Sequence, residues 1–411
     1  MRIFKFGGAS VKNAAAIRNL QDILSNYADE KLFVVVSAMG KTTNKLEHLA
    51  KLGFAQKPYE MAIHEIEQEH IEISEELLGE VPAPIKKLFA SLANTVARGM
   101  ESWPEYYDQV VSHGELLSTS LIVQFLKRTM PVEWLDARDF IATSEHYMQA
   151  KVDIQATKEN ISAILASEKT FLTQGFIGRS ANGKSTTLGR EGSDYSAALF
   201  ANFLQADELV VWKDVPGIMT ADPKLSSEVK QYDRLTYRRA VEMTYYGAKV
   251  IHPKTMGPLA KANIPMTVRS FLDLNQKGTL ITSDEALAEE VLPSMVYRYD
   301  QVLVSLRIPD GSTIDHLLMS EVMQDLSQLE VQINLMQHSA LSFSFCLDED
   351  KAQLENMRGL LGRKYSVLEN NGLHLVTFMN YEKGKGQTMP AMKEIFLEQR
   401  TRHHHRILYR P

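Results

Sequence analysis

Cysteine is almost absent from this sequence: Cys346 is the only one among 411 residues. A single thiol excludes an intrachain disulfide and any metal site built from several thiolates, and it fits a reducing compartment. Long apolar runs are missing as well, since the longest wholly apolar stretches, such as 32–36, fall far short of the roughly 20 residues that a spanning helix needs. The first ten residues lack the apolar core of a secretory signal. We therefore expect a cytoplasmic protein that does not associate with a membrane.

Neither sign of charge is in large excess. The sequence has 45 Lys and Arg against 51 Asp and Glu, which gives a net charge of −6. So small an imbalance provides no general attraction to nucleic acid or to an anionic membrane, and we expect neither as a partner. Apolar residues make up 44% of the sequence. At this length, that composition is typical of a globular protein with two or three packed units of about 150 residues each.

Short apolar runs alternate with helical patterns over the first two thirds of the chain. The Val-rich run 32–36 is typical of a strand buried on both faces of a parallel sheet, and Asn13 is the expected N-cap of the first helix. Residues from about 54 to 111 show no strand signals and are predicted to form a helical insertion. Strands separated by helices predict an α/β fold, with a largely parallel sheet sandwiched by helices. The predicted strands are 2–6, 32–36, 132–135, 170–177, 209–212 and 264–268.

The pattern changes near residue 285, where we place the boundary between a first domain, 1–288, and a second, 289–411. The second contains a βαββαβ pattern of roughly 80 residues, which is typical of small ligand-binding or dimerising domains. It shows no catalytic cluster, so regulation and structural support both remain open; His403–His405 is predicted to lie in a solvated tail. Its predicted strands are 302–308, 331–336 and 341–346, with a hairpin of 365–368 and 373–378 that turns at Asn370-Asn371-Gly372, and its predicted helices are 314–329 and 353–363.

The end of the first predicted strand carries residues suited to binding an anion. Gly7 and Gly8 would let the backbone approach a bulky anion closely, and their N–H groups can contact phosphate oxygens. Lys5 would add a positive charge. The alternative is a tight strand-to-helix turn with a surface lysine.

A glycine-rich turn at 187–195 precedes another predicted helix. Arg190 in this turn can bind a carboxylate in bidentate fashion, which favours a functional role. Ser193 and Asp194 fall where the helix begins, so capping of that helix could explain both of them.

Two further segments allow both a functional and a structural interpretation. At 211–224 a strand ends at Asp214, and the lysines and aspartates around it would lie beyond the carboxyl end of the sheet, where a nucleotide and its metal can bind. A polar loop is the alternative. Ser112 and Glu115 open a helix and match a Ser-x-x-Glu capping box, which is the interpretation that we favour for these residues alone.

The octapeptide 178–185 matches the P-loop pattern G-x-x-x-x-G-K-S letter for letter. A phosphate-binding P-loop requires a helix to begin at its Lys-Ser pair, here Lys184-Ser185. The chain instead continues to a second glycine turn before any helix, so we interpret the match as chance.

Six motifs, taken together and in this order, resemble those of the aspartate kinases of the amino-acid-kinase family. They reach to about residue 283, and the βαββαβ tail resembles the ACT regulatory domain of such kinases. The motifs are KFGGAS at 5–10, SAMGKTTNKL at 37–46, SHGELLST at 112–119, TLGREGSDYSAA at 187–198, WKDVPGIMTADPK at 212–224 and EMTYYGAKVIHPKT at 242–255.

The resemblance implies phosphoryl transfer from MgATP to the side-chain carboxylate of L-aspartate, giving 4-phospho-L-aspartate on the way to lysine, threonine and methionine. It implies ATP as cofactor with Mg²⁺ carried by the nucleotide, an amino-acid effector at the ACT-like region, and a homodimer. By motif position, Lys5 would stabilise the transferring phosphoryl group, Gly7 and Gly8 would hold the phosphates, and Asp194 would organise the lysines. The implied substrate-binding residues are Thr43, Glu115, Arg190 and Ser193, and the implied ATP-binding residues also include Lys213, Asp214, Met219, Lys224 and Lys249.

Physical chemistry agrees with this set of residues. The substrate carboxylate has a reference pKa of ≈ 3.9 and is ionised at neutral pH, so the reaction needs no general base and no catalytic His or Cys. Phosphoryl transfer requires positioning and charge stabilisation instead. An amino-diacid needs one cationic and one anionic partner, which Arg190 and Glu115 supply.

Three departures from the family pattern affect these expectations. Glu191 stands where relatives commonly have glycine, and it is tolerable only if its side chain points outward. Lys213 and Met219 stand where many relatives have Thr and Tyr. The region after residue 380 leaves room for only one complete ACT-like unit plus fragments. The alternatives are a kinase for another small acid such as acetylglutamate or glutamate, a P-loop NTPase, and a non-catalytic amino-acid sensor.

Overall fold

The computed structural model describes the chain except for residues 163–168, 223–228, 249–250, 288–291, 330 and 381–390. The described residues form two compact units, each of which is taken by itself below. The first comprises 1–218, 231–241 and 249–289, and the second comprises 219–230, 242–248 and 290–411. None of the helices in the described stretches has both the length and the apolar character that crossing a membrane requires.

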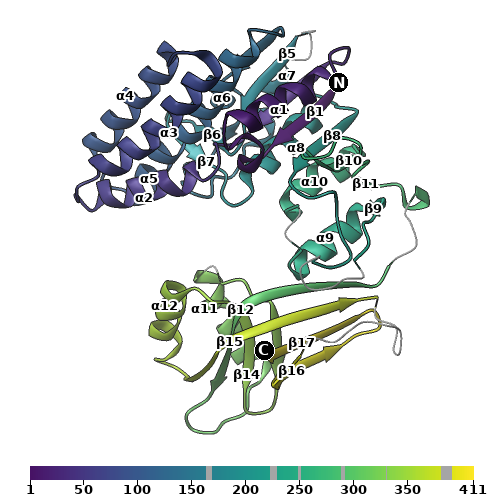
Figure 1. Ribbon diagram of the computed structural model, residues 1–411. Helices are drawn as coiled ribbons and strands as arrows, with labels where there is room; N and C mark the ends of the chain where they lie inside the picture. Colours follow the sequence, from purple (N-terminus) through teal and green to yellow (C-terminus); the bar gives the residue numbers. More distant parts are fainter. Residues whose placement is uncertain (163–168, 223–228, 249–250, 288–291, 330, 381–390) are drawn as a thin grey trace. The chain divides into compact units, whose positions relative to one another are not determined.

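An eight-stranded sheet forms the centre of the first unit (Figure 1), with the strand order β3-β5-β2-β1-β8-β10-β11-β9. The first six strands in this order, β3-β5-β2-β1-β8-β10, are all parallel to their neighbours, whereas β11 is antiparallel to β10. The predicted largely parallel sheet is therefore confirmed. The strands are β1 Arg2–Phe6, β2 Leu32–Val36, β3 Val132–Leu135, β5 Thr170–Gln174, β8 Glu208–Lys213, β9 Arg234–Thr236, β10 Met266–Ser270 and β11 Thr279–Thr282.

Helices cover both faces of this sheet. On one face, apolar side chains of α1 to α6 form a single core cluster with alternate strand residues such as Phe4 and Val34. On the other face, the ring of Phe200 on α8 lies 4.7 Å from that of Phe33, centroid to centroid. The helices of this unit are η1 Gly8–Val11, α1 Ala14–Ser25, α2 Thr42–Phe54, α3 Glu60–Leu78, α4 Ala83–Arg98, α5 Trp103–Val111, α6 His113–Leu126, η2 Ala137–Asp139, α7 Ile154–Ser162, α8 Gly192–Phe203, α10 Pro253–Ala262 and η3 Glu285–Leu287. One more helix, α9 Tyr237–Tyr246, has its first five residues in this unit and its last five in the second.

Local signals located several of these elements. The side chain of Asn13 accepts the Ala16 N–H (2.9 Å), so its predicted role as N-cap of α1 is confirmed. The stretch 54–111, which lacks strand signals, contains α3, α4 and α5.

The predicted strand at 170–177 was wrong in its extent. The chain leaves the central sheet after Gln174, where Phe176 adopts a left-handed backbone conformation (φ 69°). It then enters a separate three-stranded sheet of β4 Ala142–Thr143, β6 Ile177–Ser180 and β7 Ser185–Thr187.

His113 joins α6 to α4 inside the first unit and makes the stability of the fold sensitive to acid. It is 7% exposed, its Nδ1 lies 2.9 Å from the Gln109 carbonyl and its Nε2 lies 3.2 Å from the Ser91 hydroxyl. Burial lowers the pKa of His113 to about 4, although its carbonyl contacts oppose the shift. Between about pH 6.5 and pH 4 the imidazole is therefore protonated in the unfolded chain and neutral in the folded chain, so the free energy of unfolding falls as the pH is lowered.

We expect His113→Gln to remove this part of the pH dependence. Between pH 6.5 and 4 the free energy of unfolding of the wild type should fall by up to about 3 kcal/mol more than that of the variant. Urea denaturation across this range measures the difference, and the same substitution at exposed His64 is the control. Equal slopes for His113→Gln and the wild type would contradict the prediction.

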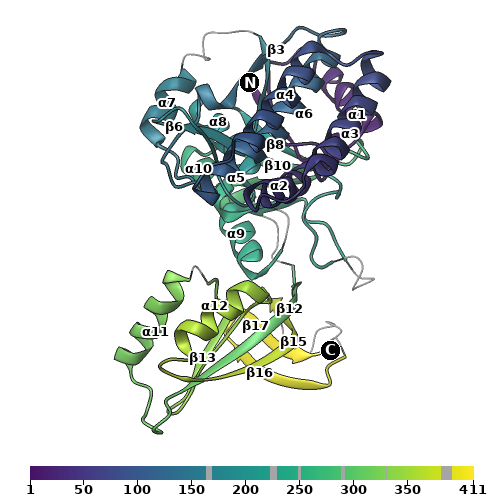
Figure 2. The same ribbon diagram turned by 90° about the vertical axis from the view of Figure 1, so that its left-hand side faces the viewer.

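The second unit contains a six-stranded sheet with the order β13-β14-β12-β15-β17-β16, in which the neighbours are antiparallel. Helices α11 and α12 lie side by side on one face of it (Figure 2), over a core that includes Val304, Phe345 and Met357. The elements are β12 Ser294–Arg307, α11 His316–Gln328, β13 Leu335–His338, β14 Phe343–Asp348, α12 Lys351–Leu361, β15 Ser366–Met379, β16 Glu394–Arg400 and β17 His404–Arg410.

The hairpin predicted at Asn370-Asn371-Gly372 was wrong. Residues 366–379 form the single strand β15, because β12 is equally long and pairs with both halves of it. The register shifts between Arg298 and Leu303, and Gly372 has φ 67°, so the asparagine-glycine sequence marks an irregularity in a long strand rather than a turn.

The expected solvated tail was also wrong. After residue 391 the chain forms β16 and β17, and β17 pairs with β15. His405 is 2% exposed, and its Nε2 lies 2.8 Å from the Glu398 carboxylate. Of the three consecutive histidines, His404 and His405 thus begin a sheet strand, and His403 is exposed just before it.

Candidate active site

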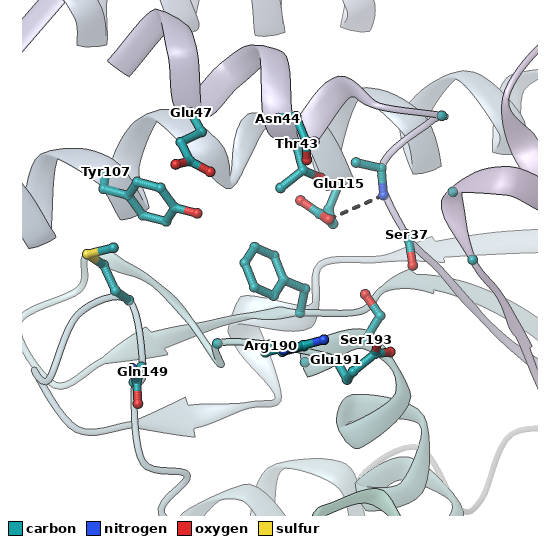
Figure 3. Close-up of a pocket in the computed structure, with 18 of the residues that line it drawn as sticks. Ser37, Thr43, Asn44, Glu47, Tyr107, Glu115, Gln149, Arg190, Glu191 and Ser193 are labelled. Atoms are coloured by element: carbon teal, nitrogen blue, oxygen red, sulfur yellow. Dashed lines mark hydrogen bonds between the residues drawn. The ribbon is translucent and has the colours of Figure 1, made fainter. Parts of the chain in front are cut away.

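A cavity of about 600 Å³ opens in the first unit where β1 and β2 end. Figure 3 shows Thr43 and Glu115 facing Arg190 and Ser193 across it. The parallel strands place their carboxyl ends at this edge, and the first turns of α2, α6 and α8 complete the wall. The described lining residues are Lys5, Gly7, Gly8, Ser37, Ala38, Gly40, Thr43, Asn44, Glu47, Tyr107, Glu115, Met148, Gln149, Phe176, Gly189, Arg190, Glu191, Gly192 and Ser193.

Lys5, the penultimate residue of β1, lies beside a buried carboxylate. Its Nζ lies 2.5 Å from Oδ1 of Asp194, and Nζ of Lys213, at the end of β8, lies 3.8 Å from the other carboxylate oxygen. Burial by itself raises the pKa of Asp194, but the two ammonium groups outweigh burial and hold that pKa below its usual value. Asp194 is 0% exposed, so it fixes the Lys5 ammonium at the wall of the cavity.

Gly8 has no room for a side chain. A Cβ at this position would meet the carbonyl oxygens of Gly40 at 2.8 Å and Ala38 at 2.9 Å, and Gly8 already accepts the Gly40 N–H. The glycine therefore lets the chain after β1 lie directly against the chain after β2. Gly7 and Gly8 both line the cavity beside Lys5.

Glu115 does not form the capping box that its spacing with Ser112 predicted. α5 runs almost directly into α6, so Ser112 has helical backbone angles and its hydroxyl donates to the Gln109 carbonyl (3.2 Å) rather than capping α6. The Glu115 side chain instead points to the cavity, where Oε1 accepts the Ala38 N–H at 3.2 Å (Figure 3).

The second carboxylate oxygen of Glu115 is buried and has no hydrogen-bond partner among the described residues. Burial raises the pKa of Glu115 to about 8, and the Ala38 hydrogen bond opposes that shift. A buried carboxylate without a cation is costly unless a ligand supplies one. The observation therefore points to a cationic group of a bound ligand, such as an ammonium.

Arg190 lies in the turn before α8. Gly189 takes a left-handed conformation (φ 75°), and the Gly192 N–H donates to its carbonyl (3.0 Å). Glu191 occupies the N-cap position with φ 56° and caps nothing with its side chain. It is exposed at the rim of the cavity. Asp194 is engaged by Lys5, so the capping alternative does not explain it.

The structure brings most of the expected residues to one place. Lys5, Gly7, Gly8, Thr43, Glu115, Arg190 and Ser193 line the cavity, with Asp194 and Lys213 behind Lys5. Asp214 is exposed immediately after β8, and Met219 falls in the second unit. Lys224 and Lys249 lie outside the described residues.

Sequence reasoning missed several lining residues. Tyr107 comes from the helical insertion, Met148 and Gln149 from the loop after β4, and Phe176 from the break after β5. Burial, followed by the charge of Glu47, raises the pKa of Tyr107 to about 12. No local pattern marks these positions, because each reaches the cavity only through tertiary packing.

The P-loop match belongs to a β-hairpin. Residues 178–185 run from β6 through a turn with Gly183 at φ 81° into β7, and no helix begins at Lys184. The Lys184 ammonium pairs with Glu105 (2.5 Å). The interpretation of the match as chance is confirmed.

The chain is similar to a known family and to several known proteins. The family model described as the amino acid kinase family matches residues 1–270. Lysine-sensitive aspartokinase 3 of Escherichia coli is 34% identical over 355 residues, which are 84% of this chain and 78% of that protein. Bifunctional aspartokinase/homoserine dehydrogenase 2 of Zea mays is 30% identical over 298 residues, which are 69% of this chain and 32% of that protein.

Two crystal structures of E. coli aspartokinase III are similar to the chain over its full length. The complex with aspartate and ADP has a TM-score of 0.82, and the complex with lysine and aspartate has a TM-score of 0.80. In each comparison the two sequences are 29% identical, and the match covers 96% of the E. coli chain.

Proposed function

This chain belongs to the amino acid kinase family, and we infer that it is an aspartate kinase, which transfers a phosphoryl group from ATP to the side-chain carboxylate of L-aspartate. The observation that carries the inference is the shared cavity of Lys5, Arg190 and Glu115. Those three residues offer two cations and one unpartnered buried carboxylate oxygen. L-Aspartate has the complementary set of two carboxylates and one ammonium.

We propose a role for each of these side chains. Glu115 binds the substrate ammonium, which supplies the missing partner of its buried oxygen. Arg190 binds the α-carboxylate through its planar guanidinium. Thr43 and Ser193 line the same cavity and hydrogen-bond the substrate. The β-carboxylate is then left to face Lys5.

The chemistry needs positioning and charge stabilisation more than proton transfer. The attacking carboxylate is ionised at neutral pH, so the reaction needs no general base. Lys5, held by Asp194, stabilises negative charge on the transferring phosphoryl group in a site sheltered from water.

We propose that ATP binds toward β8, with Gly7 and Gly8 against its phosphates. Lys213 and Asp214, at and after the end of β8, belong to this proposed nucleotide site. Met219, Lys224 and Lys249 stay predictions that rest on motif position. The part of the chain that the structure describes has no group of three His, Cys, Asp or Glu side chains placed to hold a metal ion. We propose that Mg²⁺ binds together with the nucleotide, held by its phosphates, where it neutralises their charge.

Trapping of the acyl phosphate with hydroxylamine tests this function. L-Aspartate with ATP should yield the hydroxamate, whereas L-glutamate and N-acetylglutamate should yield little. Turnover of one of the other acids in preference to aspartate would favour another kinase of the family. Absence of any acyl phosphate would favour the non-catalytic sensor.

We propose that the chain from residue 289 on, which makes up most of the second unit, is an ACT-like regulatory region, and that the protein forms a homodimer. The order β12-α11-β13-β14-α12-β15 is the βαββαβ pattern, and β16 and β17 extend the same sheet. Lysine is the proposed effector, because the E. coli relative is named lysine-sensitive and one of its structures contains lysine.

We expect L-lysine to inhibit the purified enzyme more strongly than L-threonine at equal concentration. Initial rates over a titration with each amino acid measure this. Activity that neither amino acid changes would contradict the proposed effector while leaving the kinase assignment intact.

A further inference from the structure

Asp108, on α5, is a fully buried carboxylate that the reaction as described above does not use. It is 0% exposed and forms no ion pair with any described residue. Burial raises its pKa to about 6 in spite of its hydrogen bonds. Burying an ionisable carboxyl group costs stability. The groups that Asp108 binds indicate why an acid is present at this position.

Three hydrogen bonds define what Asp108 holds. Its Oδ2 accepts two backbone N–H groups, from Thr187 at 2.8 Å and from Met148 at 3.0 Å. Its Oδ1 accepts the Thr187 hydroxyl at 2.6 Å. One oxygen atom thus ties together two loops that are about 40 residues apart in sequence.

Both loops form walls of the cavity. Thr187 ends β7 and lies three residues before Arg190, and Met148, in a left-handed conformation (φ 67°), lines the cavity with Gln149. The loops also contact each other, because the Ala150 N–H donates to the Thr187 carbonyl at 2.9 Å.

We propose that Asp108 is a positioning residue that sets the Arg190 turn and the Met148–Gln149 loop for binding of the substrate α-carboxylate. The inference rests on the proposed function. Asp108 touches no substrate; it acts through the two backbone N–H groups. Because the two N–H groups donate to the same oxygen, Oδ2, holding the loops requires a hydrogen-bond acceptor at that point and not a negative charge.

The acceptor requirement distinguishes two substitutions. Asp108→Asn can place its amide oxygen at the position of Oδ2 and its NH₂ toward the Thr187 hydroxyl, which can accept. This variant should keep the KM for aspartate within about threefold of the wild type and should unfold at an equal or higher temperature. Asp108→Ala leaves both N–H groups unpaired and should raise the KM for aspartate by about 10- to 100-fold, with a much smaller change in the KM for ATP.

Two further measurements separate positioning from general loss of stability. Val110→Ala removes buried volume from the same helix without touching either loop, so it should lower the melting temperature and leave the KM for aspartate unchanged. Hydrogen exchange of the Met148 and Thr187 amides should be fast in Asp108→Ala and slow in Asp108→Asn and the wild type. This readout does not depend on which acid the enzyme phosphorylates.

An unchanged KM for aspartate in Asp108→Ala would overturn the proposal, and so would equal increases in the KM for aspartate and ATP. A loss in Asp108→Asn as large as that in Asp108→Ala would show that the charge is needed, which also overturns it. If the wild type does not phosphorylate aspartate, the proposed function fails, and the exchange rates still decide whether Asp108 holds the two loops.

Discussion

Lys5→Ala is expected to lower kcat with aspartate and ATP by about 10²- to 10³-fold, while the KM for aspartate changes far less. The Lys5 ammonium lies at the cavity wall, 2.5 Å from the buried Asp194 carboxylate, so it is oriented before substrate binds. Loss of one preorganised electrostatic group of this kind costs about this much in turnover. Steady-state kinetics with both substrates varied in turn measure the effect.

The matched control is Lys184→Ala, which removes the lysine of the P-loop-like sequence. Lys184 pairs with Glu105 in the β6–β7 hairpin, and this variant should keep near wild-type kcat. Lys5→Ala leaves Asp194 buried with only Lys213 nearby, so the double variant Lys5→Ala/Asp194→Asn should restore thermal stability without restoring turnover. A large loss in Lys184→Ala and a small one in Lys5→Ala would instead favour a P-loop NTPase.

Glu115→Gln is expected to raise the KM for aspartate by roughly 100-fold and, at the same time, to stabilise the fold. The amide cannot form an ion pair with the substrate ammonium, and it removes a buried carboxyl group that in the free enzyme must either stay protonated or carry a charge without a cation. Binding sites are often less stable than the fold could be, because they hold groups that only the ligand satisfies.

The gain in stability should depend on pH with a definite sign. Because burial raises the pKa of Glu115 to about 8, the folded wild type keeps a proton that the unfolded chain has lost above about pH 4.5. The advantage of Glu115→Gln in free energy of unfolding should therefore be small at pH 4.5 and grow to about 1–3 kcal/mol at pH 8. Urea denaturation at both pH values measures it.

Glu47→Gln is the control for this pair of effects. Glu47 lines the same cavity, but its side chain is 39% exposed and pairs with Lys51, so water already stabilises its charge. We expect little change in stability at either pH. If Glu115→Gln binds aspartate as the wild type does, the assigned ammonium partner is wrong.

Local sequence signals are enough to predict several elements of this fold. The strands Arg2–Phe6 and Leu32–Val36 and the Asn13 cap depend on residues a few positions apart, and short-range sterics and hydrogen bonding suffice to fix them. The order of the motifs also predicted that Lys5 and Arg190 belong to one site, because each motif contains residues suited to binding one part of the substrates.

The roles of several other residues depend on partners that are distant in the sequence. Glu115 fits a capping box over four residues, yet its partner is Ala38, 77 residues away. Asp108 meets Thr187 over 79 residues, and the length of β15 follows from its neighbour β12 rather than from its own turn signal. Burial and hydrogen-bond partners are set by packing between distant segments, so a window along the chain contains no information on them.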